Sequence, residues 1–235
     1  MAARFEVRHG FAVLIDNREF PPESGLPPRV GAERDLHRIR EICQIAGFTE
    51  YEGLPTNNLT LVEIRQLLQD VIRQDFSEYD ALAIFISSHG IKGEIRTTDG
   101  GTITVQEIVS TFEGIATLQS KPTLFFITNC LERDIILRDE ARPVVPFHVP
   151  NTYDVLIVYA SVDGYEYPRD PENGSFAPML LNEIFHNHEF EDNSLTEMLS
   201  IGFQRGSNNT EQPDGRKQVM CFVSSLTKPV YFIRP

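Results

Sequence analysis

The stretch that decides the fold runs from Ala81 to Gly90 and reads ALAIFISSHG. It opens with a continuous apolar run and lacks the alternation of a strand that has one face in water. Such a run is typical of a strand buried on both faces of a largely parallel sheet. His89 and Gly90 follow it directly, at the end of the strand where open α/β sheets form their sites.

Further strands and helices alternate along the rest of the chain. Apolar runs of strand length occur at Phe11–Ile15, Leu124–Thr128, Val155–Ala160, Val219–Val223 and Val230–Ile233. Helical patterns cover about Ala32–Ala46 and Ala177–His186, and the first of these helices stops at Gly47. Three more helices start with capping boxes, at Thr60–Glu63, Thr104–Glu107 and Ser194–Glu197. This alternation predicts an α/β fold, a doubly wound sheet with helices on both faces.

Composition limits the classes of partner and the environment. The chain has 34 acidic and 21 basic residues, for a net charge of −13, which disfavours nucleic acid and anionic membrane as partners. No apolar run approaches the length of about 20 residues that a membrane span needs. Three cysteines without a secretory signal favour a reducing environment, so we expect a cytoplasmic protein.

A thiol and an imidazole follow two of the expected strands at their carboxyl ends. A thiolate nucleophile needs a base nearby and N–H donors for the developing oxyanion. His89, Cys130 and the backbone N–H of Gly90 would supply these groups if the two strands are neighbours. Taken singly, each side chain has a plainer interpretation as a buried structural residue, which we favour for Cys43 and Cys221. The remaining histidines lack zinc-type spacing, so we expect no metal and no cofactor.

Five segments, in order along the chain, resemble the caspase family of cysteine proteases. They are Phe11–Phe20 (FAVLIDNREF), Phe85–Gly90 (FISSHG), Lys121–Cys130 (KPTLFFITNC), Val158–Phe176 (VYASVDGYEYPRDPENGSF) and Gln218–Phe232 (QVMCFVSSLTKPVYF). The resemblance extends over nearly the whole chain and implies a three-layer sandwich with a six-stranded, mostly parallel sheet. It also implies an executioner-like catalytic domain without a prodomain.

The resemblance assigns roles to individual residues. It makes His89 the acid/base and Cys130 the nucleophile, with an oxyanion hole formed by the N–H groups of Gly90 and Cys130. Two arginines, which can hold a carboxylate through charge-assisted bonds, would bind a substrate aspartate. The substrate-binding set implied in this way is Arg29, Ser88, Thr128, Tyr167 and Arg169.

The resemblance also divides the single domain, residues 1–235, into two parts. Residues 1–140 resemble the large subunit and residues 150–235 the small subunit, joined by a short, proline-containing connection over 131–152. Asp134 and Asp139 are the candidate processing sites in that connection. Neither is followed by a small residue, which disfavours cleavage there.

Several positions depart from the family pattern. The family motif around the nucleophile is Gln-Ala-Cys-Arg/Gln-Gly, whereas this chain has Thr128 in place of the glutamine and Leu131 and Glu132 after the cysteine. A threonine hydroxyl reaches less far than an amide, and Glu132 would raise the pKa of the thiol if it faces the site. Glu166 and Pro168 alter the other wall of the pocket, and the proline removes one backbone donor.

Two functions therefore remain open, with the enzyme slightly favoured. The first is a caspase-type endopeptidase that cuts peptides or proteins after aspartate, with weakened activity, in apoptosis or related signalling. The second is a pseudo-caspase, such as an insect or other invertebrate one, that dimerises with and regulates an active caspase. In either case the C-terminal strands would form a homodimer or heterodimer. A third, weaker alternative is a redox-sensing thiol.

Overall fold

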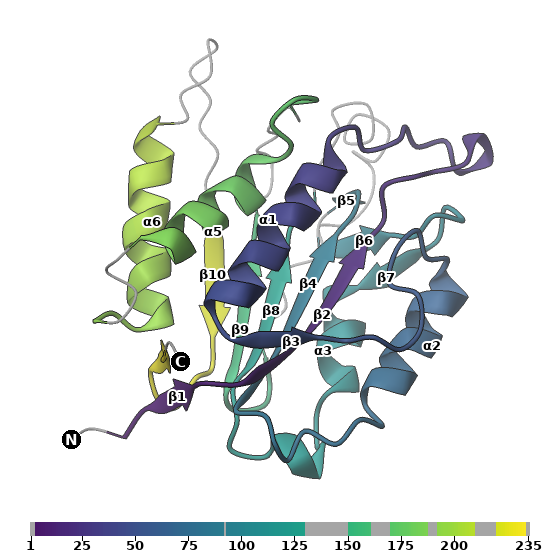
Figure 1. Cartoon of the computed structure of the whole chain (residues 1–235). Helices are drawn as coiled ribbons and strands as arrows, with labels where there is room; N and C mark the ends of the chain where they lie inside the picture. The colour runs from purple at the N-terminus through teal and green to yellow at the C-terminus, as the bar shows by residue number, and fades with distance from the viewer. Residues whose placement is uncertain are drawn as a thin grey trace.

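A mixed sheet of six strands forms the centre of the chain in the computed structural model, which describes residues 3–91, 93–129, 150–160, 170–187, 192–209 and 220–233 (Figure 1). The strand order is β10-β9-β8-β4-β2-β3, in which β10 runs antiparallel to β9 and all other neighbours are parallel. The bounds are β2 (Gly10–Asp16), β3 (Phe48–Glu50), β4 (Ala81–Ser87), β8 (Thr123–Ile127), β9 (Val155–Tyr159) and β10 (Cys221–Ser224).

The central strands are buried on both faces, as their apolar runs predicted. Every residue of β2, β4, β8 and β9 is buried. Successive side chains of a strand point to opposite faces, so Ala83 and Phe85 belong to one core, while Ile84 and Ile86 belong to the other. A polar residue at any of these positions would therefore lie in an apolar layer, which explains the continuous apolar runs.

Helices cover both faces of the sheet, so the expected three-layer α/β sandwich is confirmed (Figure 1). One face carries α1 (Ala32–Ile45), α5 (Phe176–His186) and α6 (Leu195–Asn209), and the other carries α2 (Leu61–Val71) and α3 (Val105–Thr111). Short 3-10 turns occur at Pro22–Ser24 and Ala116–Leu118. Among the described residues, no helix combines the length and the apolar character that crossing a bilayer requires.

Two smaller sheets lie beside the central one. β1 (Phe5–Val7) pairs in parallel with β11 (Val230–Phe232), and β5 (Gly90–Ile91), β6 (Glu94–Arg96) and β7 (Thr102–Thr104) form an antiparallel sheet. The run Val230–Ile233 therefore contains a strand, as expected, and this strand lies outside the central sheet. The sixth central strand is β3, whose three residues contain only one apolar side chain and gave no strand signal.

Local signals placed the helix ends correctly. Thr60 and Glu63 form a complete capping box at the start of α2, and Thr104 accepts from the Glu107 N–H at the start of α3. Gly47 ends α1 in the left-handed region, at φ 72°, where a side chain would be strained. The division at residues 131–152 stays a prediction, since only residues 150–152 of that segment are described.

Candidate functional site

His89 lies at the carboxyl end of β4 and is almost completely buried, with 1% of its surface exposed. Its Nε2 lies 2.8 Å from the carbonyl oxygen of Pro27, and its ring packs against Phe20 at 4.7 Å between centroids. A carbonyl oxygen can only accept, so Nε2 carries the hydrogen, and the neutral ring has its basic nitrogen at Nδ1. The loop between β2 and α1 thus fixes the orientation of the imidazole through Nε2.

The backbone on either side of His89 is held by β6. The Ser88 hydroxyl donates to the carbonyl of Arg96 at 2.6 Å, and the Arg96 N–H donates to the carbonyl of His89 at 2.8 Å. At Gly90 a Cβ would lie 2.2 Å from the Asn129 side chain and 2.6 Å from the Glu94 carbonyl, so only glycine fits. Ser88 makes an internal hydrogen bond, and its expected contact with substrate stays a prediction.

Thr128 connects the end of β8 to the end of β4. It directly follows β8, is buried, and its hydroxyl lies 2.7 Å from the hydroxyl of Ser87 and 3.2 Å from the carbonyl of Ile86. Since β4 and β8 are neighbours, the segments that carry His89 and Cys130 leave the same edge of the sheet. The Thr128 hydroxyl is therefore engaged with β4, and its expected contact with substrate stays a prediction.

Arg29 lies deep in the same edge of the sheet, with 1% of its side chain exposed. Its Nη1 lies 3.1 Å from a carboxylate oxygen of Asp16 and 2.8 Å from the carbonyl oxygen of Asn17, and its Nη2 lies 3.8 Å from Asp35. The Asp16 and Asp35 carboxylates therefore approach different nitrogens of this guanidinium group, Nη1 and Nη2. The Asn17 N–H donates to the carbonyl of Ser87 at 2.9 Å, which connects the Arg29 cluster to the strand before His89.

Asp16 and Asp35 are site residues that the sequence reasoning missed. Burial raises the pKa of Asp16 above its ordinary value, while Arg29 and, more weakly, Arg18 oppose that rise. The sequence did contain a signal for Asp16, because it is a charged residue at the end of an otherwise apolar run. Asp35 gave no distinct signal, because acidic residues commonly occupy the first turn of a helix.

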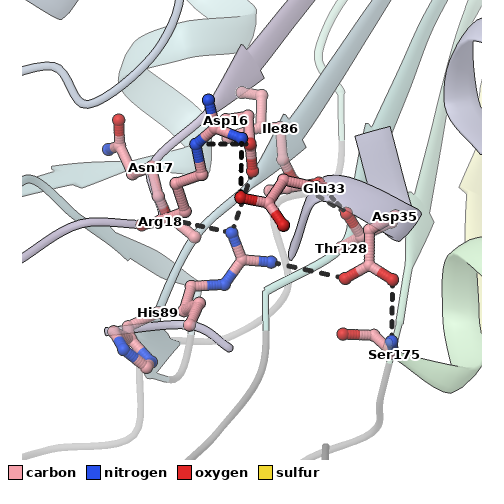
Figure 2. Close-up of polar contacts among 12 residues, drawn as sticks. Asp16, Asn17, Arg18, Glu33, Asp35, Ile86, His89, Thr128 and Ser175 are labelled. Carbon is pink, nitrogen blue, oxygen red and sulfur yellow. Dashed lines mark hydrogen bonds and ion pairs between the residues drawn. The ribbon is translucent and has the colours of Figure 1, made fainter. Parts of the chain in front are cut away.

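Asp35 also connects the Arg29 cluster to the rear part of the chain. It is fully buried, and one carboxylate oxygen accepts from the Ser175 N–H at 2.7 Å (Figure 2). The neighbouring Arg38 donates to the carbonyl of Asn173. The start of α1 is therefore tied to the segment that leads into α5, which follows the expected second arginine closely in sequence.

The structure describes five of the predicted site residues and leaves the others outside the described residues. It brings His89, Gly90, Ser88, Thr128 and Arg29 to one edge of the sheet. The positions outside the described residues are Cys130, Leu131, Glu132, Asp134, Asp139, Glu166, Tyr167, Pro168 and Arg169. Within the part of the chain that is described, no three histidine, cysteine or acidic side chains group in a way that could hold a metal ion.

Cys43 illustrates the opposite of a reactive thiol. It lies on the buried face of α1, and burial raises the pKa of its thiol to about 12. At pH 8 its thiolate fraction is then roughly 10⁻⁴, so we expect iodoacetamide to leave Cys43 unmodified in the native protein and to modify it in urea. Peptide mapping by mass spectrometry measures both; equal labelling of Cys43 in the two states would contradict the burial.

The fold and this edge of the sheet define an α/β protein with a buried, oriented histidine, and comparison with known proteins identifies the family. A model of the family described as "Caspase domain" matches residues 9–231. Caspase-7 of Gallus gallus is 26% identical over 95% of this chain and 77% of its own length. Caspase-3 of Mesocricetus auratus is 29% identical over 95% of this chain and 83% of its own length, and caspase-3 of Bos taurus is 28% identical over 95% and 84%. The chain belongs to the caspase family.

Proposed function

We propose that this chain is a caspase-type cysteine endopeptidase that hydrolyses peptide bonds after aspartate, with weak activity, in apoptosis or related signalling. The observation that carries the proposal is the buried imidazole of His89, oriented through Nε2 by the Pro27 carbonyl. It stands at the edge of the sheet to which β8 delivers the chain just before Cys130. Membership in the caspase family supports the same function.

In the proposed reaction, Nδ1 of His89 takes the proton of the Cys130 thiol, and the thiolate attacks the carbonyl carbon of the substrate. The N–H groups of Gly90 and Cys130 stabilise the oxyanion. Collapse of the intermediate breaks the peptide bond, and the imidazolium gives its proton to the leaving amine. Water then attacks the thioester, assisted by the same imidazole, and releases the acid and the free thiol.

The remaining assignments belong to the same proposal. Arg29 and Arg169 would bind the substrate carboxylate, with contributions from Ser88, Thr128 and Tyr167. We further propose that the chain acts in the cytoplasm, needs no cofactor, and comprises a large-subunit-like part (1–140) and a small-subunit-like part (150–235). Asp134 and Asp139 are its candidate processing sites.

A panel of acidic tetrapeptide reporters tests the enzyme proposal directly. We expect turnover in a strongly ordering salt such as citrate, and a covalent adduct of an aspartyl halomethylketone on Cys130, which mass spectrometry would locate. Both require the thiol, so the Cys130→Ala variant is the matched control and should show neither. Turnover that is equal in the control, or no turnover and no adduct in the parent, would refute the proposal.

A second candidate is a pseudo-caspase that regulates an active relative, and three observations favour it. Arg29 is already paired with two buried carboxylates, and the Thr128 hydroxyl is engaged with β4. In the described part of the sheet, β10 has a neighbour on one side only, which suits a homodimer or heterodimer through the C-terminal strands. Co-purification with an active caspase, with a change in that caspase's activity, would support this candidate, whereas an inert monomer in cell extract would count against it.

A further inference from the structure

Asp16 stands closer to Arg29 than any other carboxylate in the described structure. The two side chains meet at 3.1 Å between Nη1 and Oδ1, and both are at least 97% buried. Asp35 approaches the other side of the guanidinium at 3.8 Å. In this low-dielectric setting a charge-assisted contact is strong, so the positive charge of Arg29 is largely balanced from within the chain.

The ion pairs that adjoin this pair among the described residues add no net positive charge. Arg18 lies 4.0 Å from Asp16, but it is partly exposed and also approaches Glu33 at 3.6 Å. Arg38 lies 4.0 Å from Asp35 and donates to the Asn173 carbonyl. With Arg29, Arg18 and Arg38 against Asp16, Asp35 and Glu33, the cluster sums to zero when all groups are ionised.

We propose that Asp16 is a specificity-determining residue, which neutralises Arg29 and leaves the pocket with little preference for aspartate over its neutral isostere asparagine. The inference rests on the proposed function, because Arg29 is assigned to the substrate pocket through the family resemblance. An incoming carboxylate would have to compete with Asp16 for the same guanidinium and would be repelled by both aspartates. A side-chain amide would avoid that repulsion.

The Asp16→Asn substitution separates this role from a merely structural one. Asparagine keeps the shape of aspartate and a carbonyl oxygen that can accept from Arg29, but it removes the negative charge. A structural partner of Arg29 would change stability without changing which peptide binds. A specificity determinant would change the ratio of affinities for an acidic and a neutral peptide.

The experiment measures binding, so it does not depend on turnover. Two acetylated tetrapeptide amides, identical except for a final aspartate or asparagine, are titrated into the wild-type protein and Asp16→Asn by calorimetry. In the wild type we expect the two affinities to differ by less than about tenfold; in Asp16→Asn we expect the aspartyl peptide to gain about tenfold or more while the asparaginyl peptide does not change. In the Asp16→Asn/Arg29→Gln double variant the gain should vanish.

Asp75→Asn is the matched control, since it makes the same chemical change at an exposed position between α2 and β4, at the opposite end of β4 from His89. Its ratio of affinities should equal that of the wild type. A wild-type preference for aspartate above about a hundredfold would overturn the proposal without any variant. So would an unchanged ratio in a folded Asp16→Asn protein, or the absence of binding by either peptide. Binding with the expected ratios but no Cys130-dependent turnover would uphold Asp16 and refute the endopeptidase.

Discussion

Replacing His89 with alanine should lower kcat/KM for a Cys130-dependent peptide substrate by about 10³-fold or more. The imidazole is the only described side chain at this edge of the sheet that combines a basic nitrogen with a fixed orientation, given by the Pro27 carbonyl at 2.8 Å. In the proposed reaction, the Cys130 thiol then lacks the base that takes its proton, and the leaving amine receives no proton. Loss of a general acid/base that also activates the nucleophile has an effect of this size.

The control for this variant is His37→Ala, because the His37 side chain lies on α1 and is 76% exposed. It should keep wild-type kcat/KM with the same reporters. His89→Ala should also slow covalent labelling of Cys130 by the halomethylketone, since labelling depends on the thiolate. A circular dichroism spectrum that matches the wild type shows that the fold persists; activity within tenfold of wild type in that folded variant would remove His89 from the mechanism.

The architecture could be predicted from the sequence wherever a segment is buried on a regular face. The runs that form β2, β4, β8 and β9 are apolar because both sides of the sheet are covered, and the capping box at Thr60 reports a local hydrogen-bond requirement. These signals depend on residues next to one another in the chain. β3 was missed, and the sheet that β11 joins could not be predicted, because their pairing is decided by distant partners, Gly10–Ala12 for β3 and β1 for β11.

In the candidate site, too, local features could be predicted from the sequence and contacts between distant residues could not. His89 and Gly90 could be placed from the strand that precedes them, because a strand end is a local feature. The contact of Arg29 with Asp16 joins residues thirteen positions apart through a turn, and the contact of Asp35 with Ser175 joins two elements 140 residues apart. No periodic pattern in the sequence predicts contacts of this kind. The sequence therefore indicated an arginine for a substrate carboxylate, whereas the structure supplies two carboxylates of its own.

Replacing Arg29 with alanine should lower the free energy of unfolding at pH 7 by about 3–5 kcal/mol. Of the substitutions proposed for this protein, we expect this one to have the largest effect on stability. The substitution leaves Asp16 and Asp35 buried without the guanidinium between them and removes the donor to the Asn17 carbonyl. Buried charge that has lost its partner is costly because neither water nor a counter-ion replaces it. Urea unfolding followed by circular dichroism measures the loss.

Arg65→Ala is the matched control, since Arg65 pairs with Glu107 at 2.7 Å, a shorter contact than that of Arg29, but with 53% of its side chain exposed. Water replaces the lost partner there, so we expect a loss below about 1 kcal/mol.

The pH dependence of the stability of Arg29→Ala gives a second test with a definite sign. Burial raises the pKa of Asp16, and Arg29 opposes that rise. Removing Arg29 therefore raises the pKa of Asp16 further. The folded variant then holds a proton on Asp16 more tightly than the unfolded chain does, and its deficit relative to wild type should shrink as the pH falls from about 7 to about 4.5. A deficit that is equal at both pH values, or no larger than that of Arg65→Ala, would mean that water reaches the Arg29 cluster and that Asp16 and Asp35 do not need the arginine.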